Sequence, residues 1–344
     1  MIKAAILGAT GYAGAELMRI LSCHSGVEIS YPASHSYAGS KFSDIYPGMK
    51  GVLDMVLRED DIEKAAEEAD VIFLSLPAGL ASSLVTEKIL SSSVVIDLGA
   101  DFRLHDRAVY EKWYHTEHHG PKLLEKAVYG LPEIHRNEIK GKRLIANPGC
   151  YTTCSIMTLY PLVKNGLIET KGIVIDAKSG TSGSGRGEKL GSLYCEVNES
   201  IKAYGVTNHR HTPEIEQELS EASGKDIVLQ FTPHLVPMNR GILADCYARL
   251  VDGVSEEDVR KAYSIYEHEP FVRLVDNPPE TRYVKGTNCI DISWRIDKRT
   301  GNIIALGAID NLVKGAAGQA VQNMNIAFGL DETEGLSLGA GSPF

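Results

Sequence analysis

The sequence predicts an α/β protein with two domains, a doubly wound parallel sheet followed by an α+β domain with a mostly antiparallel sheet. Three observations predict this class. The chain has 344 residues, which is more than one hydrophobic core usually serves. Its first third alternates short apolar runs with segments of helical period, as βαβ units do. Its second half has mainly strand-like runs and few helices, which favours antiparallel pairing.

The alternation in the first third defines the expected parallel sheet. Apolar runs separated by amphipathic segments predict strands over 4–7, 27–31, 71–76 and 94–98, with helices over 13–22, 62–69 and 81–90. Residues 110–141 are rich in histidine and we expect them to be loop-rich.

The pattern of predicted strands and helices changes after residue 150. Strand-like runs cover 172–178, 226–233, 242–250, 289–296 and 302–308, and helical segments cover 212–222 and 255–266. The tail over 311–328 is helical and rich in small residues, which let a helix approach another element or a ligand closely. The last dozen or so residues should be loosely structured.

Composition excludes several classes of function. Hydrophobic residues make up 43% and the net charge is −10, without a long Lys/Arg run, which argues against nucleic-acid binding. No run of 18 apolar residues or signal sequence is present, so we expect a cytoplasmic protein with no membrane partner. The six cysteines form no Cys-x-x-Cys pair, and the histidine triplet His115, His118 and His119 lacks other ligands, so no metal is predicted.

A glycine-rich turn lies between the first strand and the first helix. In Gly8-x-x-Gly11-x-x-Gly14, the first glycine makes the tight turn, the second admits phosphates to backbone N–H groups, and the third lets helix pack on strand. The alternative is a plain βα turn. We favour a dinucleotide site of the Rossmann type, made by Gly8, Thr10, Gly11, Tyr12, Ala13 and Gly14.

The end of the second strand favours NADP over NAD. NAD-binding proteins usually place an acidic side chain there to hold the ribose hydroxyls. This chain instead has Ser34, His35 and Ser36 with Lys41 close behind, and no acid before Asp44. Hydroxyls and a potential cation suit a 2′-phosphate, whereas the alternative is a solvated loop with an incidental histidine.

Cys150 is the candidate nucleophile. It follows the apolar run 144–146 and an Asn-Pro-Gly turn, and residues 151–159 can continue as a helix. A thiol at a helix N-terminus has a lowered pKa and is activated. Cys23, Cys154 and Cys246 have no such setting and fit the alternative of small buried apolar residues.

A cysteine mechanism needs a proton donor and acceptor, and His209 and His211 are both candidates. Thr212 can cap a helix with Pro213 at its first position, which would fix His211 at the start of that helix. The glycine- and serine-rich loop 180–186, ending in Arg186, is either an anion cradle or a mobile surface loop. Arg103 follows a strand of the parallel sheet, where ligands bind.

These features together resemble the N-acetyl-γ-glutamyl-phosphate reductase family nearly end to end. The resemblance is carried by residues 8–17, 97–104, 128–133, 147–151, 179–186, 209–215, 232–241 and 308–328. Aspartate-semialdehyde dehydrogenases share the fold and chemistry but lack the His-Arg-His-Thr-Pro-Glu-Ile and Pro-Met-Asn-Arg-Gly strings. The chain departs from the family at Thr152, usually proline, at His35, often arginine, and at Gly99, commonly serine.

The resemblance implies a semialdehyde-dehydrogenase architecture. Residues 1–149 and 311–344 would form the NADP-binding domain and 150–310 the catalytic and dimerisation domain of a homodimer or homotetramer. It implies Cys150 as nucleophile and His211 or His209 as acid–base. The residues implied to face the cofactor are Leu76, Pro77, Ser182, Gly183 and Asn311, and those implied to face the phosphate or substrate are Arg103, Asn147, Arg186 and Glu214.

The implied reaction is NADPH-dependent reduction of N-acetylglutamyl 5-phosphate to the semialdehyde through a Cys150 thioester, in arginine biosynthesis. One alternative is a reductase of a related acyl phosphate, such as aspartyl phosphate or a carrier-bound glutamyl or amino-adipyl phosphate. A second alternative is a nucleotide-sensing regulator that uses the glycine turn without catalysis.

Overall fold

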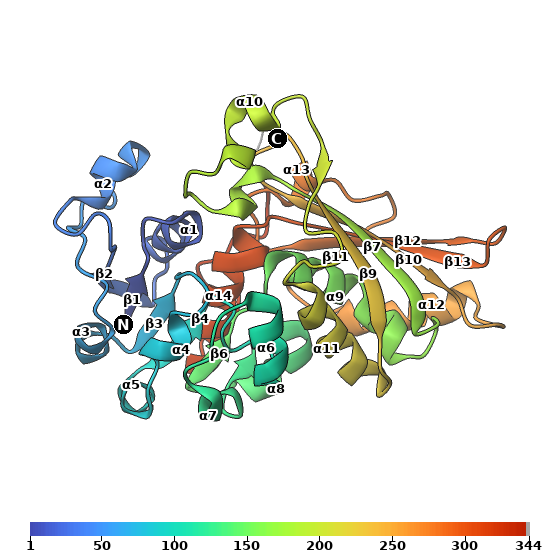
Figure 1. Ribbon diagram of the computed structural model, residues 1–344, viewed down its shortest axis with the longest axis horizontal. Helices are drawn as coiled ribbons and strands as arrows, with labels where there is room; N and C mark the ends of the chain where they lie inside the picture. The colour runs from blue at the N-terminus through green and yellow to red at the C-terminus, as the bar shows by residue number, and fades with distance from the viewer. Residues whose placement is uncertain (342–344) are drawn as a thin grey trace. The chain divides into compact units, whose positions relative to one another are not determined.

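The computed structural model describes residues 1–341, and the chain divides into two compact units (Figure 1). The first unit comprises Met1–Pro148 and Ala316–Leu336. The second comprises Gly149–Gly315 and the described residues from 337 onward. The expected α/β class is confirmed. Over the described part of the chain, no helix is long and apolar enough to cross a lipid bilayer.

The first unit is built on a parallel sheet, as predicted. Within the described residues it has six strands in the order β2-β1-β3-β4-β6-β5, and every pair is parallel. The central strands are buried along their whole length because helices cover both faces of such a sheet. The strands are β1 (Ile2–Leu7), β2 (Val27–Pro32), β3 (Val71–Leu74), β4 (Val94–Asp97), β5 (Val128–Tyr129) and β6 (Leu144–Ala146).

The helices of the first unit agree with the predictions except in two places. The predicted helix over 81–90 is two short helices, because Thr86 accepts a hydrogen bond from the Ile89 N–H and caps a new one. The stretch expected to be loop-rich contains α6, α7, α8 and β5, so that prediction was wrong. The helices are α1 (Tyr12–Leu21), α2 (Phe42–Ile45), α3 (Ile62–Glu68), α4 (Ala81–Leu84), α5 (Glu87–Ser92), α6 (Arg107–Tyr114), α7 (Pro121–Leu124) and α8 (Pro132–Ile139), with a 3-10 turn at Pro47–Met49.

The C-terminal helix α14 (Gly318–Phe328) packs within the first unit, against α1 and α8. Its Asn325 Oδ1 lies 3.0 Å from Nε2 of the buried His24. Its Gln322 donates to Glu133 at 3.3 Å. Chain segments that are distant in sequence therefore complete one core.

The second unit contains a larger, mixed sheet. In the described residues its seven strands are ordered β11-β12-β13-β10-β7-β9-β8, and four of the six pairs are antiparallel. The prediction of a mostly antiparallel sheet is confirmed. The strands are β7 (Lys171–Ser179), β8 (Lys202–Ala203), β9 (Val228–Leu235), β10 (Ile242–Arg249), β11 (Val272–Leu274), β12 (Ile290–Asp297) and β13 (Asn302–Ile309).

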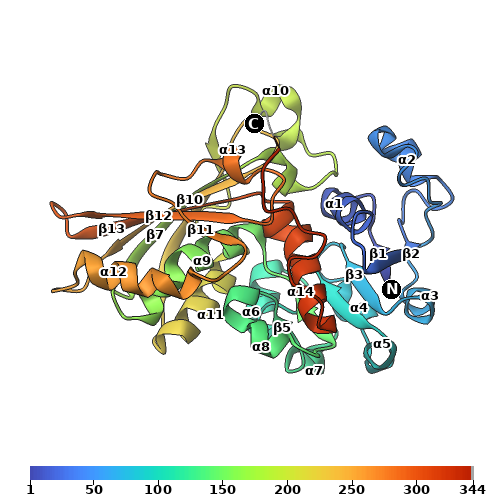
Figure 2. The ribbon, with the colours of Figure 1, turned by 180° about the vertical axis from the view of Figure 1, so that it is seen from behind.

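Helices of the second unit cover one face of this sheet, as Figures 1 and 2 show for α9, α11 and α12. Residues from Tyr151 to Val163 of α9 are buried, and the Tyr263 and Tyr266 hydroxyls donate to α9 carbonyls at 2.7 and 2.9 Å. The helices are α9 (Cys150–Lys164), α10 (Tyr194–Val197), α11 (Thr212–Ser223), α12 (Glu256–Tyr263) and α13 (Thr281–Val284), with 3-10 turns at Thr181–Ser184, Leu190–Ser192 and Ser264–Tyr266 and a π-helical turn at Val313–Ala317.

Candidate active site

Cys150 is the first residue of α9, directly after the N-cap residue Gly149. Its side chain is half-buried. Gly315 lies against it so closely that a Cβ on Gly315 would stand 2.8 Å from Cys150 Cβ. The thiol therefore occupies a helix N-terminus, as the sequence predicts, and any larger residue at 315 would displace it.

Glu214 fixes the start of α9 by hydrogen bonding. Its Oε1 accepts the Gly149 N–H at 2.9 Å and lies 2.8 Å from the Thr152 hydroxyl, which is also 2.5 Å from the Gly149 carbonyl. Glu214 is fully buried in the first turn of α11, where the helix dipole favours an acid. Glu214 therefore lies against the backbone of the Cys150 turn, and its expected contact with substrate stays a prediction.

His209 and His211 lie together beside Tyr151, the residue after Cys150. His209 Nδ1 accepts the His211 N–H at 3.2 Å, and the two imidazole rings are 4.9 Å apart. Burial, assisted by the nearby Arg210 cation, lowers the pKa of His209 to about 4. His209 is therefore neutral at physiological pH, with Nδ1 as an acceptor. The helix begins at Thr212 and its N-cap is His211, one residue earlier than predicted.

Two tyrosines complete this histidine cluster. The Tyr151 ring packs edge-on against His209 at 5.7 Å and against His211 at 6.0 Å. The Tyr204 hydroxyl donates to the Tyr151 hydroxyl at 3.1 Å, which in turn donates to the His234 carbonyl at 3.2 Å. Burial raises the pKa of Tyr204 to about 12 and that of Tyr151 further, so both remain protonated. Tyr204 was not predicted from the sequence, because it lies in a segment without a recognisable motif.

The loop predicted to cradle an anion lies beside Asn311 in the second unit. Asn311 donates to the Ser182 hydroxyl at 3.0 Å, and its Oδ1 accepts the Gly241 N–H at 2.8 Å. A Cβ on Gly183 would lie 3.8 Å from the Asn311 amide. The structure thus brings together Ser182, Gly183 and Asn311, whereas Arg186 is exposed at the end of the loop.

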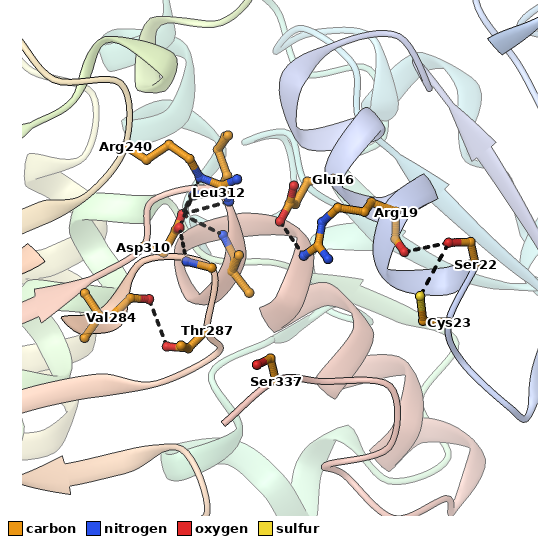
Figure 3. Close-up of polar contacts among 12 residues, drawn as sticks. Glu16, Arg19, Ser22, Cys23, Arg240, Val284, Thr287, Asp310, Leu312 and Ser337 are labelled. Carbon is orange, nitrogen blue, oxygen red and sulfur yellow. Dashed lines mark hydrogen bonds and ion pairs between the residues drawn. The ribbon is translucent and has the colours of Figure 1, made fainter. Parts of the chain in front are cut away.

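Asp310, which was not predicted from the sequence, holds the main chain at Leu312 and Gly286. Figure 3 shows Arg240 directed at the Asp310 carboxylate, with an Nε–Oδ2 distance of 3.0 Å. The same carboxylate accepts the Leu312 N–H at 2.8 Å and the Gly286 N–H at 2.7 Å. Asp310 is fully buried. An aspartate directly after an apolar strand was the available signal.

The glycine turn of the first unit fits a dinucleotide. Gly8 has φ +79°, and a Cβ there would lie 2.4 Å from the Ser75 carbonyl oxygen. A Cβ on Gly14 would lie 2.2 Å from the Gly8 carbonyl oxygen. Gly11 is the N-cap residue of α1 and has no side chain with which to cap the helix, which leaves room for an anion at the N–H groups of the first turn. Leu76 lies at the same turn, 3.4 Å from the Gly8 Cβ position.

The loop after β2 is tied to this turn. The hydroxyls of Thr10 and Ser34 are 2.7 Å apart and buried. Asp60 accepts the Gly8 N–H at 3.2 Å and the His35 N–H at 3.0 Å. His35 and Ser36 are exposed. Asp60 was not predicted, because this acid lies 25 residues beyond His35 and not directly after the strand, where an acid was sought.

The residues expected to face the leaving phosphate follow two neighbouring strands, Arg103 after β4 and Asn147 directly after β6. Arg103 is buried and donates to the Asn147 carbonyl and the Leu98 carbonyl, both at 2.8 Å. Asn147 donates to the Ala316 carbonyl at 3.2 Å. The fully buried Asp97 accepts the Gly99 N–H, and burial, with the neighbouring Asp101 charge, raises the pKa of Asp97 to about 7.

The histidine triplet has a packing role at His118. Its Nε2 lies 2.7 Å from the Asp101 carbonyl oxygen, and its ring packs edge-on against Phe102 and Tyr110. Across residues 1–341, no cluster of three or more His, Cys, Asp or Glu side chains has the geometry of a metal site.

Two family models match the chain. The one described as "Semialdehyde dehydrogenase, NAD binding domain" matches residues 3–142. The one described as "Semialdehyde dehydrogenase, dimerisation domain" matches residues 150–311.

Curated relatives match over almost the whole length. A protein of Lachnospira eligens named N-acetyl-gamma-glutamyl-phosphate reductase is 57% identical over 98% of this chain and 99% of its own. A protein of Lachnoclostridium phytofermentans with the same name is 54% identical over 98% and 99%.

Solved structures share the fold at low identity. Aspartate semialdehyde dehydrogenase II of Vibrio cholerae, complexed with ASA, superposes with a TM-score of 0.69 at 17% identity, covering 95% of this chain and 98% of that one. Aspartate semialdehyde dehydrogenase of Candida albicans, with NADP, superposes with a TM-score of 0.64 at 19% identity and the same coverage.

Proposed function

The chain belongs to the N-acetyl-γ-glutamyl-phosphate reductases, and on that premise we propose how its residues reduce N-acetylglutamyl 5-phosphate to N-acetylglutamate 5-semialdehyde and phosphate. The observation that carries the proposal is Cys150 at the N-terminus of α9, on a turn held by Glu214. Partial positive charge at a helix N-terminus favours the thiolate, which is the nucleophile that this chemistry needs.

Cys150 performs the covalent step. Its thiolate attacks the acyl carbon, the carbon–oxygen bond to phosphate breaks, and phosphate leaves with the electron pair. A thioester remains on Cys150. When bound, NADPH supplies the hydride that takes this carbon to the aldehyde level. The carbon–sulfur bond then breaks, which releases the semialdehyde and regenerates the thiolate.

His211 is the acid–base in this proposal, and His209 is a positioning residue. Nδ1 of His209 is engaged by the His211 N–H, and its pKa of about 4 keeps it neutral. It therefore holds the turn that presents His211. His211 donates a proton to the substrate oxygen after hydride transfer and takes it back as the aldehyde departs.

The first unit provides the nucleotide site, and we propose NADP as the preferred form. Ser34, His35 and Ser36 offer hydroxyls and a potential cation to a 2′-phosphate, and the structurally similar dehydrogenase of Candida albicans was solved with NADP. The match to a dimerisation domain supports a homodimer or homotetramer. A reaction that uses NADPH and a labile acyl phosphate favours the cytoplasm.

Substrate and cofactor are tested in the reverse direction. We expect phosphate-dependent reduction of NADP by N-acetylglutamate 5-semialdehyde, weaker reduction of NAD, and little activity with aspartate semialdehyde. Faster turnover of aspartate semialdehyde would support the related acyl-phosphate reductase instead. Absence of turnover, together with an ordinary Cys150 thiol pKa near 8.5 by labelling, would support a nucleotide sensor.

The histidine assignment is tested by matched substitutions. His211→Asn should lower kcat about 100-fold or more and remove one limb of the pH profile, whereas His209→Asn should mainly alter KM and stability. The opposite pattern would exchange the two roles.

A further inference from the structure

We propose that Asp60 is a specificity-determining residue that limits how strongly this chain prefers NADP over NAD. The proposal rests on the proposed function in one respect, namely that the nucleotide binds at the turn over residues 8–14. Asp60 itself has no sequence motif and comes from outside both the glycine turn and the loop after β2.

Asp60 joins the two segments that a dinucleotide would touch. Its Oδ1 lies 3.2 Å from the Gly8 nitrogen and its Oδ2 lies 3.0 Å from the His35 nitrogen. One carboxylate therefore spans the tight turn that admits the phosphates and the loop that follows β2. The side chain is half-buried, so its charge is less screened than that of a fully exposed acid.

The corner around Asp60 is rigidly connected. Thr10 and Ser34 are joined by their buried hydroxyls at 2.7 Å, and the Ala9 N–H donates to the Ala33 carbonyl at 2.8 Å. The segment leading to Asp60 runs along the end of β2, because the Ser34 N–H donates to the Arg58 carbonyl at 2.9 Å. The carboxylate is thus held in place by three segments of the first unit.

The position of this carboxylate matters for the ribose. In NAD-binding proteins an acid at the end of the second strand accepts hydrogen bonds from the ribose hydroxyls and excludes a 2′-phosphate. Here an acid reaches the same corner from another segment, but both of its oxygens already accept main-chain N–H groups. Asp60 therefore contributes negative charge that opposes a 2′-phosphate, and the exposed Lys41 carries positive charge that can offset it.

The test measures binding rather than turnover. Calorimetric titration of the full chain with NADP⁺ and with NAD⁺ gives the ratio of their two dissociation constants. Asp60→Asn removes the charge, so the preference for NADP⁺ should rise about three- to tenfold, and this gain should shrink at high ionic strength. Asp61→Asn is the matched control, because Asp61 is the adjacent acid and caps α3 through the Lys64 N–H instead. Its ratio should change less than about twofold.

A second measurement separates the effect of the Asp60 charge from the effect of its hydrogen bonds to the main chain. Asp60→Glu keeps the charge but moves the carboxylate oxygens, so amide hydrogen exchange at Gly8 and His35 should accelerate. The ratio of the NAD⁺ and NADP⁺ dissociation constants should stay within about twofold of the parent value. An unchanged or reduced preference for NADP⁺ in Asp60→Asn overturns the proposal, even if both affinities fall. If Asp60→Asn does not fold, Asp60→Ser carries the same test, since its hydroxyl can accept either N–H. Failure of the parent chain to bind either nucleotide would instead overturn the proposed function.

Discussion

The two units build their candidate sites from different parts of the chain. In the first unit the candidate nucleotide site is made by backbone N–H groups around Gly8, Gly11 and Gly14, and a side chain at Gly8 or Gly14 would collide with main chain. In the second unit the site is made by the side chains of Cys150, Glu214 and the histidine pair. A backbone site depends on free space, whereas a side-chain site depends on chemical groups and their burial. Substitutions should therefore act differently in the two units: added side-chain volume should damage the first site, and loss of a chemical group should damage the second.

The largest expected effect is at the nucleophile. Cys150→Ser should lower turnover at least about 1000-fold, because a serine hydroxyl is far from ionised at neutral pH. NADP⁺ affinity should stay near the parent value, since the glycine turn is unchanged. Cys154→Ala is the control, because burial raises the pKa of the Cys154 thiol well above its usual range and it should tolerate replacement. Substantial turnover in Cys150→Ser would refute the thioester route.

The next largest effect is expected in the first unit, where an added side-chain atom would clash with the main chain. In Gly14→Ala the new Cβ would meet the Gly8 carbonyl oxygen at 2.2 Å, and no rotamer can relieve a main-chain contact. We expect destabilisation of about 3 kcal/mol and at least about tenfold weaker NADP⁺ binding, with Cys150 labelling unchanged. Gly11→Ala, whose new Cβ would have its nearest atom at 3.5 Å, should cost only about 1 kcal/mol, because alanine is a poorer N-cap residue than glycine. Equal losses in both variants would contradict the steric explanation.

Asp97 should make the first unit less stable as pH rises. Its folded pKa of about 7 lies above the ordinary value of 3.8, so the folded state binds more protons between these values. The stability that this proton provides is complete below about pH 4 and is lost as pH rises through about 7, by about 2–4 kcal/mol in total. Unfolding followed by Trp113 fluorescence in a Trp294→Phe background measures this slope, and Asp97→Asn should flatten it. A slope that Asp97→Asn leaves intact would assign the titration to another group.

His209 should give the second unit the opposite slope. Its folded pKa of about 4 lies below the ordinary value of 6.5, so the unfolded state binds more protons in that window. Stability is complete above about pH 6.5 and falls as pH drops toward about 4, by about 1–3 kcal/mol. Trp294 fluorescence in a Trp113→Phe background reports this unit, and His209→Phe should remove most of the slope. If stability changed with pH in the same direction in both units, the predicted contrast between Asp97 and His209 would be wrong.

The smallest effect concerns the start of α9. Thr152→Val removes the hydroxyl that lies 2.8 Å from Glu214 and should destabilise the protein by about 1–2 kcal/mol, with slower Cys150 labelling. Thr153→Val is the matched control, because the buried Thr153 hydroxyl has no hydrogen-bond partner among the described residues. That change should be neutral or slightly stabilising. Equal losses of stability in the two variants would mean that the contact between Thr152 and Glu214 does not stabilise the protein.

Much of the first unit could be predicted from the sequence because its signals are local. Strands β1, β2, β3 and β4 appear as apolar runs at nearly their observed bounds. The error over 110–141 has a local cause as well. α7 and α8 each begin at a proline, Pro121 and Pro132, and a proline at the first helical position is a helix-start signal that the expectation of loops left out. The helix over 81–90 was split by the Thr86 cap.

The sequence by itself determined the fold class, the family, the strand–turn–helix setting of Cys150 and the glycine turn, because each depends on residues close together in the chain. Only the tertiary structure decided that Asp60 reaches His35, that Glu214 lies buried against the Cys150 turn, that Asp310 pairs with Arg240, and that His209 stays neutral. These contacts join residues tens of positions apart. Hydrogen bonding and burial depend on distance in space, which local sequence patterns do not encode.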